Sequence, residues 1–207
     1  MKIKTTPASP DALDHDTLLL GFFSDERPPK GYCGLVDWRL NGWISGRIAE
    51  GRISGHFLEK LAFAFPERIG VSRLLLFGLG NLSELTCDRL YNAGCEMART
   101  VAGIGADDLV LPVPAAGRGP LEPDRMTEAL FTGLFDGFGH VPGKLAALVL
   151  EIPATPDHAE DIHRGLVLFR RHVGAAEVEI PEFSDLFGKR HERPAEGCGL
   201  KTKGTLT

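Results

Sequence analysis

Short continuous apolar runs alternate with longer amphipathic segments along most of this chain. A strand buried on both faces produces such a short run, whereas a helix packed on one side repeats its apolar positions every three or four residues. Between the first two runs, residues 35–44 predict short helical pieces broken at Gly42. Strands alternating with helices predict an α/β domain in which helices cover both faces of a parallel or mixed sheet. The runs that predict strands are 17–23, 73–77 and parts of 56–65, 107–114, 144–153 and 176–183.

The amphipathic segments predict three longer helices. Residues 82–102 and 124–135 form the first two, and the third has complete start and stop signals. Thr155 is its expected N-cap, Pro156 its first residue, and Gly174 follows a basic last turn.

Composition and charge narrow the classes of protein to consider. A length of 207 residues with 43% hydrophobic and 25% charged residues is typical of one globular domain. We assign residues 1–188 to this domain and 189–207 to a polar C-terminal tail. A net charge of -5 gives no reason to expect a nucleic-acid partner, and no apolar run is long enough to cross a membrane. The four cysteines lack any metal-finger spacing, so we expect reduced thiols and a cytoplasmic protein.

The strand at 73–77 runs into Gly78-Leu79-Gly80, which raises the question of a cofactor phosphate. A dinucleotide-binding loop needs the pattern G-x-G-x-x-G and an acidic residue at the end of the following strand. Ser83 occupies the third glycine position, and the next predicted strand ends in prolines instead of an acid. The sequence therefore argues against a nicotinamide site.

The charges after this loop support the same conclusion. Glu84 and Asp88 stand in the first turns of the predicted helix, where they suit the helix dipole but would compete with a bound phosphate. We expect a tight turn from strand to helix, with Asn81 or Ser83 as the helix cap.

Three segments carry a more particular pattern. They are GLVDWRLNGWISGRIAEGRISG at 34–55, RLLLFGLGNLSELTCDRLYNAG at 73–94 and EALFTGLFDGF at 128–138. Together they resemble the N-terminal domain of the leucyl aminopeptidase (M17) family, over approximately residues 17–183. The resemblance implies a macro-domain-like fold, which is a three-layer α/β/α sandwich with a mixed, mostly parallel sheet.

The chain also departs from that family. Its members hold two metal ions and their catalytic residues in a C-terminal domain marked by Asn-Thr-Asp-Ala-Glu-Gly-Arg, and no such stretch occurs in this sequence. No catalytic or metal-binding residue is therefore carried over, and no cofactor is expected. The resemblance implies a stand-alone, non-catalytic domain that acts through protein-protein contacts, with itself as an oligomer or with a peptidase-type partner.

A macro-like fold also implies an alternative function, the binding of ADP-ribose or a related nucleotide. Loops at the carboxyl ends of parallel strands form the ligand crevice of such sheets. Backbone N–H groups and one guanidinium in these loops can hold a diphosphate. The competing interpretation is an ordinary turn and a solvated crossover loop. The residues that would supply the contacts are Gly78, Gly80, Asn81, Gly117, Arg118 and Gly119.

Three other features have both a chemical and a structural interpretation. Cys33 is a reactive thiol or an inert cysteine, and no base partner is evident for it. Asp37 is the acid of a hydrolase or the cap of the short helix that follows it. Glu160 and His163 have the spacing of a carboxylate-bridged metal site, but no second copy of the motif exists, so a solvated first turn is the simpler interpretation.

Overall fold

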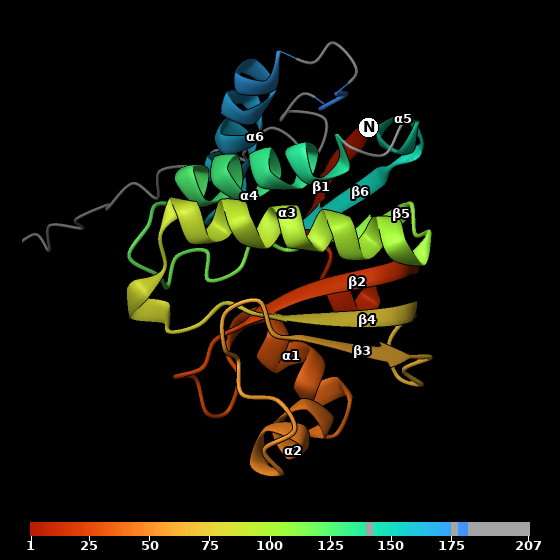
Figure 1. The fold of residues 1–207 in the computed structure, drawn as a ribbon, viewed down its shortest axis with the longest axis vertical. Helices are drawn as coiled ribbons and strands as arrows, with labels where there is room; N and C mark the ends of the chain where they lie inside the picture. The colour runs from red at the N-terminus through yellow and green to blue at the C-terminus, as the bar shows by residue number, and fades with distance from the viewer. Residues whose placement is uncertain (140–142, 175–177, 182–207) are drawn as a thin grey trace, which may run out of the picture.

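The computed structural model describes residues 1–139, 143–174 and 178–181, which form one mixed sheet covered by helices on both faces (Figure 1). Its six strands lie in the order β1-β6-β5-β2-β4-β3. All neighbouring pairs are parallel except β3 and β4. The strands are β1 (Lys2–Thr6), β2 (His15–Phe22), β3 (Lys60–Ala64), β4 (Val71–Gly78), β5 (Asp108–Val110) and β6 (Val149–Pro153). The helices are α1 (Gly31–Arg39), α2 (Trp43–Ala49), α3 (Cys87–Ile104), α4 (Pro123–Phe138), α5 (Lys144–Ala147) and α6 (Ala159–Val173), with 3-10 turns η1 (Pro10–Ala12) and η2 (Leu82–Glu84).

The two faces of the sheet bury separate hydrophobic clusters. Along β2, Leu18, Leu20 and Phe22 pack with α1 and α2, whereas Leu19 packs with α3, α4 and α6 on the other face. This alternation follows from the two-residue repeat of a strand, and it explains why β2 is continuously apolar from Leu18 to Phe22. The predicted three-layer α/β/α sandwich with a mixed, mostly parallel sheet is confirmed.

Three glycines let α3 and α4 lie very close together. A Cβ atom added to Gly94 would lie 2.2 Å from the carbonyl oxygen of Leu130, and one added to Gly133 would lie 1.9 Å from that of Tyr91. Gly137 is enclosed in the same way. These glycines belong to two of the segments that carry the family resemblance, so part of that pattern encodes helix packing.

Several expected boundaries are wrong, each for a local reason. The N-cap of α3 is Thr86, whose hydroxyl accepts from the N–H of Arg89 at 3.2 Å, and neither Asn81 nor Ser83 caps the helix. Helix α6 begins at Ala159, because the residues after Thr155 form a turn. Its C-terminal end is as expected, with Gly174 in the left-handed conformation.

The sequence did not predict β1, and the apolar stretch 144–153 is divided between α5 and β6. Strand β1 is an outer strand in which Ile3 and Thr5 are buried and Lys2 and Lys4 are exposed, so it lacks the continuous apolar run that reveals inner strands. Of the expected late strand, only Glu179 is seen to pair, with Lys2, and its end lies outside the described residues. In the described part of the chain, no helix has the length and apolar character needed to span a membrane.

Candidate functional site

The Gly78–Asn81 loop is covered by the chain segment that precedes β3. A Cβ on Gly78 would lie 2.0 Å from the carbonyl oxygen of His56, and one on Gly80 would lie 3.0 Å from the guanidinium of Arg89. The N–H of Gly80 donates to the carbonyl of Gly55 at 2.9 Å. The glycines here allow two backbone segments to pass closely, and these side chains and backbone groups fill the space beside the loop.

A single carboxylate organises the covering segment. Glu59 accepts hydrogen bonds from the backbone N–H groups of Ser54 at 2.9 Å and Gly55 at 2.7 Å, and from the Ser54 hydroxyl at 2.9 Å. Partial burial opposes ionisation, but the hydrogen bonds outweigh it and lower the pKa of Glu59 below its ordinary value of 4.5.

Glu59→Gln is expected to destabilise the fold by about 1–3 kcal/mol at neutral pH, because an amide cannot accept all of these hydrogen bonds. A lowered folded-state pKa stabilises the fold above pH 4.5, and that contribution is lost as the pH falls through the folded-state pKa. Urea unfolding at neutral and acid pH measures both effects, with the exposed Glu67→Gln as the control. A variant that keeps the wild-type loss of stability below pH 4.5 would contradict this role.

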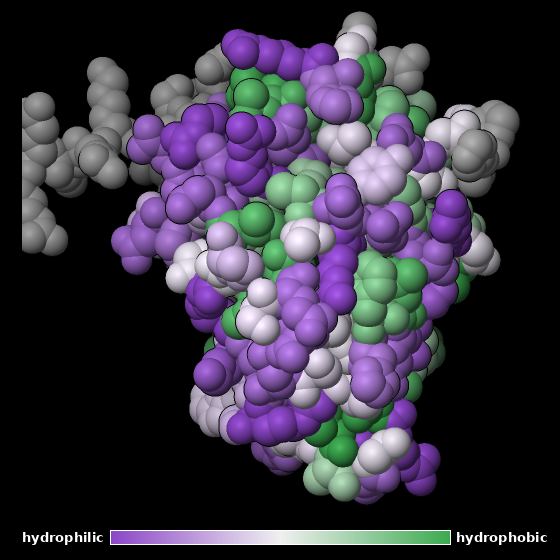
Figure 2. Space-filling model, turned by 60° about the vertical axis from the view of Figure 1, so that its left-hand side comes forward, coloured by the Kyte–Doolittle hydropathy of each residue, from purple (hydrophilic) through white to green (hydrophobic). Residues whose placement is uncertain are grey.

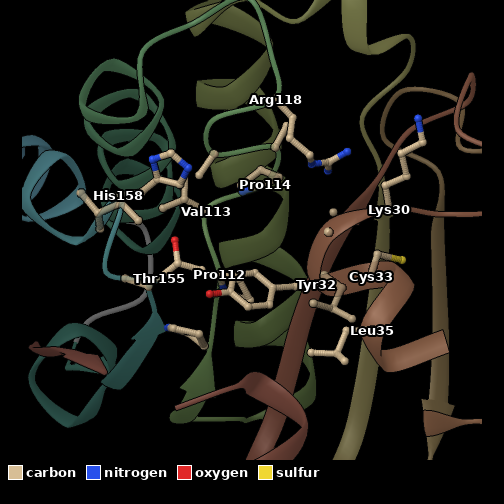
Figure 3. A pocket seen from close by; sticks show the side chains of 18 of the residues that line it. Lys30, Tyr32, Cys33, Leu35, Pro112, Val113, Pro114, Arg118, Thr155 and His158 are labelled. Carbon is tan, nitrogen blue, oxygen red and sulfur yellow. The ribbon is translucent and has the colours of Figure 1, made fainter. Parts of the chain in front are cut away.

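A cavity of about 430 Å³ opens where β2, β5 and β6 end (Figure 3). The first turn of α1 forms one side of it, and the loops that follow β5 and β6 form the other. Parallel strands place their carboxyl ends at one edge of the sheet, which is where ligands bind in open α/β sheets. Its lining includes Gly21, Lys30, Gly31, Tyr32, Cys33, Leu35, Pro112, Val113, Pro114, Ala115, Ala116, Arg118, Ala154, Thr155, Asp157 and His158.

Arg118 is the only residue of the six ligand-binding candidates that lines this cavity. Its guanidinium is turned toward the side that α1 forms (Figure 3), and a Cβ on Gly31 would lie 3.0 Å from it. It forms an ion pair with Glu26, whose side chain is 6% exposed against 31% for that of Arg118. The buried carboxylate holds the guanidinium in place beside the cavity.

The other five candidates do not line the cavity. Gly117 and Gly119 flank Arg118, and a Cβ on Gly117 would lie 2.1 Å from the imidazole of His158. Gly78, Gly80 and Asn81 lie in the covered loop. The structure therefore brings Arg118 and its neighbours to the cavity edge and does not bring the Gly78–Asn81 loop there.

The cavity combines an apolar wall with a small number of polar groups. Its wall after β5 is 112–116, Pro-Val-Pro-Ala-Ala, and Tyr32 lies across the middle of the view in Figure 3. Burial raises the pKa of the Tyr32 hydroxyl, so this group is neutral at physiological pH. Lys30 adds a cation at the exposed rim and Asp157 an anion. Such an arrangement suits a ligand that has both an apolar or aromatic part and a charged part.

The structure also bears on the other candidate residues. Burial, with Asp37 and Glu26 nearby, raises the pKa of the Cys33 thiol to about 12, so the thiol is protonated at neutral pH, which favours the inert interpretation. Asp37 lies within α1, and the N-cap residue of α2 is Gly42, so the expected capping position is wrong. The Asp37 carboxylate still accepts from the N–H of Ser45, in the first turn of α2, at 3.0 Å. Within the described ranges, no group of three histidine, cysteine or acidic residues is placed to hold a metal ion. Glu160 and His163 therefore belong to no such group.

Sequence reasoning missed most of the cavity lining. Tyr32, Pro112, Thr155 and His158 belong to no recognisable motif. The available signal was position, because Pro112 and Thr155 lie two residues beyond the ends of β5 and β6, and strand ends in an α/β sheet converge. Tyr32 gave no such signal, because it follows a proline-rich loop whose path the sequence leaves open.

Comparisons with known proteins show the family to which this chain belongs. The model of the cytosol aminopeptidase family, N-terminal domain, matches residues 19–137. A probable cytosol aminopeptidase of Cyanothece sp. (strain PCC 7425 / ATCC 29141) is 24% identical over 198 residues, covering 87% of this chain and 40% of the relative. The chain thus spans about two fifths of the length of the curated relatives that it matches.

Solved structures of two kinds share the fold. A mutant tomato leucine aminopeptidase has a TM-score of 0.56 and 19% identity, covering 84% of this chain and 38% of that one. The Trypanosoma brucei macrodomain in complex with ADP-ribose has a TM-score of 0.59 and 14% identity, covering 83% and 69%. At these identities the likeness concerns the fold alone.

Proposed function

We propose that this chain, which belongs to the cytosol aminopeptidase family through its N-terminal domain, binds a phosphate-bearing nucleotide, represented by ADP-ribose, beside Arg118. The observation that carries this proposal is the cavity of about 430 Å³ at the ends of β2, β5 and β6. Its volume lies within the range of about 300–1,000 Å³ that is usual for small-molecule sites. The macrodomain of the same fold that was solved with ADP-ribose supports the choice of probe.

The charges of the cavity assign parts of the ligand to parts of the site. The guanidinium of Arg118 and the ammonium of Lys30 attract phosphate oxygens, and the N–H groups in the first turn of α1 reinforce them. Tyr32 and the prolines after β5 offer an apolar surface to a base or a sugar. Gly117 and Gly119 allow the backbone beside Arg118 to approach the ligand. A contribution from Gly78, Gly80 and Asn81 stays a prediction, because they lie outside the cavity.

Lys30→Glu is expected to weaken the binding of ADP-ribose at least about tenfold, because a rim cation becomes an anion beside the phosphates. Calorimetric titration measures the change. Arg52→Glu is the matched control, since it changes the net charge equally at a side chain that is 68% exposed and lies outside the cavity. Equal losses in both variants would show that net charge alone is responsible, and no heat at millimolar ligand would end the proposal.

A second function, action through protein contacts, has its own support. In this proposal the domain is stand-alone and non-catalytic, and it meets itself or a peptidase-type partner through its surface. Trp38 and Phe65 are 69% and 78% exposed, although the face in Figure 2 is mostly hydrophilic with small separate hydrophobic patches. The names of the relatives favour a cytoplasmic location. Zinc- or manganese-dependent release of amino acids by the pure chain would contradict the non-catalytic role.

A further inference from the structure

The two outer strands of the sheet, β1 and β3, differ in how far their outer edges are hydrogen-bonded. Strand β1 is bridged on its outer side by Glu179, which accepts from the N–H of Ile3 at 2.9 Å and donates to the carbonyl of Met1 at 3.0 Å. Strand β3 pairs with β4 alone among the strands of the described part. An uncovered outer strand presents unpaired N–H and C=O groups that can accept another strand.

The register shows which groups of β3 are unpaired. The N–H of Phe65 donates to the carbonyl of Ser72, and the N–H of Gly78 donates to that of Glu59, each at 2.8 Å. Odd-numbered residues of β3 therefore exchange hydrogen bonds with β4, because antiparallel pairs alternate along a strand. The even-numbered residues direct their N–H and C=O groups outward. They are Lys60, Ala62 and Ala64, all exposed.

This outer edge lacks the usual protection against pairing. Proline occurs at none of the outward positions, and the central one is Ala62. The one charged side chain, Lys60, is held by Glu96 at 2.6 Å. Its charge is therefore compensated within the chain, and the edge favours neither an acidic nor a basic partner strand.

From these observations we propose that β3 pairs with β3 of a second copy of this chain, antiparallel, about a two-fold axis at Ala62. In that register every outward residue meets an outward residue of the other copy, with Ala62 opposite Ala62 and Lys60 opposite Ala64. The two lysines lie at opposite ends, so no like charges meet. The partner is a second copy because this self-pairing joins all the outward N–H and C=O groups, brings no like charges together and sets Leu61 opposite Phe63.

The odd-numbered side chains of β3, on the sheet face that α1 and α2 cover, gain apolar contacts in this pairing. Leu61 of one copy lies opposite Phe63 of the other, and Phe63 already stacks on Trp43 with ring centroids 4.2 Å apart. Pairing thus extends the hydrophobic cluster beneath α1 and α2 into the second copy. This inference rests on the second part of the proposed function, action through protein contacts, and is independent of the nucleotide site.

The test is the mass of the full chain in solution, by size-exclusion chromatography with light scattering over a concentration series. The wild-type chain is expected to be a dimer. Ala62→Pro removes an outward N–H that β4 does not use, so it should raise the dissociation constant at least about tenfold while circular dichroism stays unchanged. Ala62→Val keeps the N–H and should remain dimeric.

Charge variants test the position of the axis even where the proline variant fails to fold. Ala62→Glu and Ala62→Lys should each be monomeric, since like charges would face each other at the axis, and their mixture should recover the dimer. A dimer insensitive to these changes would overturn the pairing at β3 and leave self-association standing. A monomeric wild-type chain would overturn the inference and leave the peptidase-type partner as the remaining protein contact.

Discussion

Gly133→Ala is expected to destabilise the domain by about 3 kcal/mol, at the upper end of the cost of overpacking. The added Cβ would lie 1.9 Å from the backbone carbonyl oxygen of Tyr91, which cannot move unless α3 and α4 separate. Separation would open the larger hydrophobic cluster, to which both helices contribute buried residues. Urea unfolding measures the change in the free energy of unfolding.

Gly103→Ala is the matched control. Gly103 also lies in α3, but an added Cβ meets no atom within 4 Å. Alanine is the better helix former, so this variant should gain about 0.5–1 kcal/mol. If Gly133→Ala were as stable as Gly103→Ala, the close approach of the two helices would not depend on these glycines.

Arg118→Met is expected to destabilise the domain by about 3 kcal/mol, the lower end of the cost of removing one partner from a buried ion pair. The Glu26 carboxylate would remain buried with no positive charge beside it. The double variant Glu26→Gln with Arg118→Met removes both charges and should recover most of this loss. Urea unfolding of both variants separates the two cases.

The double variant also separates stability from binding. Although its fold is recovered, it lacks the guanidinium that we assign to the phosphates, so ADP-ribose should bind at least about tenfold more weakly. Equal stability of the single and double variants would show that Glu26 does not depend on Arg118. Unchanged affinity of the double variant would remove Arg118 from the site.

The inner strands and the family could be predicted from the sequence, because each is marked by a short continuous segment, an apolar run or a family-like pattern. Strand β4 is continuously apolar from Leu74 to Phe77, and its neighbour β2 lies parallel to it with both faces covered, as that pattern predicts. The resemblance to the aminopeptidase N-terminal domain is confirmed by the family match over residues 19–137. Strand β1 was not predicted, because its buried and exposed residues alternate over only five positions and form no apolar run.

The candidate site was harder to predict because its position depends on contacts between distant segments. From the sequence, the loop at Gly78 and Gly80 could be a tight turn or part of a ligand crevice, and the structure shows that the segment held by Glu59 covers it. The cavity lies beside Arg118, and the sequence shows neither that Tyr32 lines the same cavity nor that Glu26 is buried against Arg118. Glycine patterns record where backbones pass closely, which is a requirement of packing as often as of binding.

The most direct test of the nucleotide site is to map ADP-ribose binding on the folded chain by amide chemical shifts in NMR spectra. We predict saturable shifts at residues 31–33, 113–118 and 154–158, and the response of Gly78, Gly80 and Asn81 shows whether their loop takes part. Spectra that stay unchanged at millimolar ADP-ribose, or shifts that avoid all three cavity segments, would contradict the proposed site.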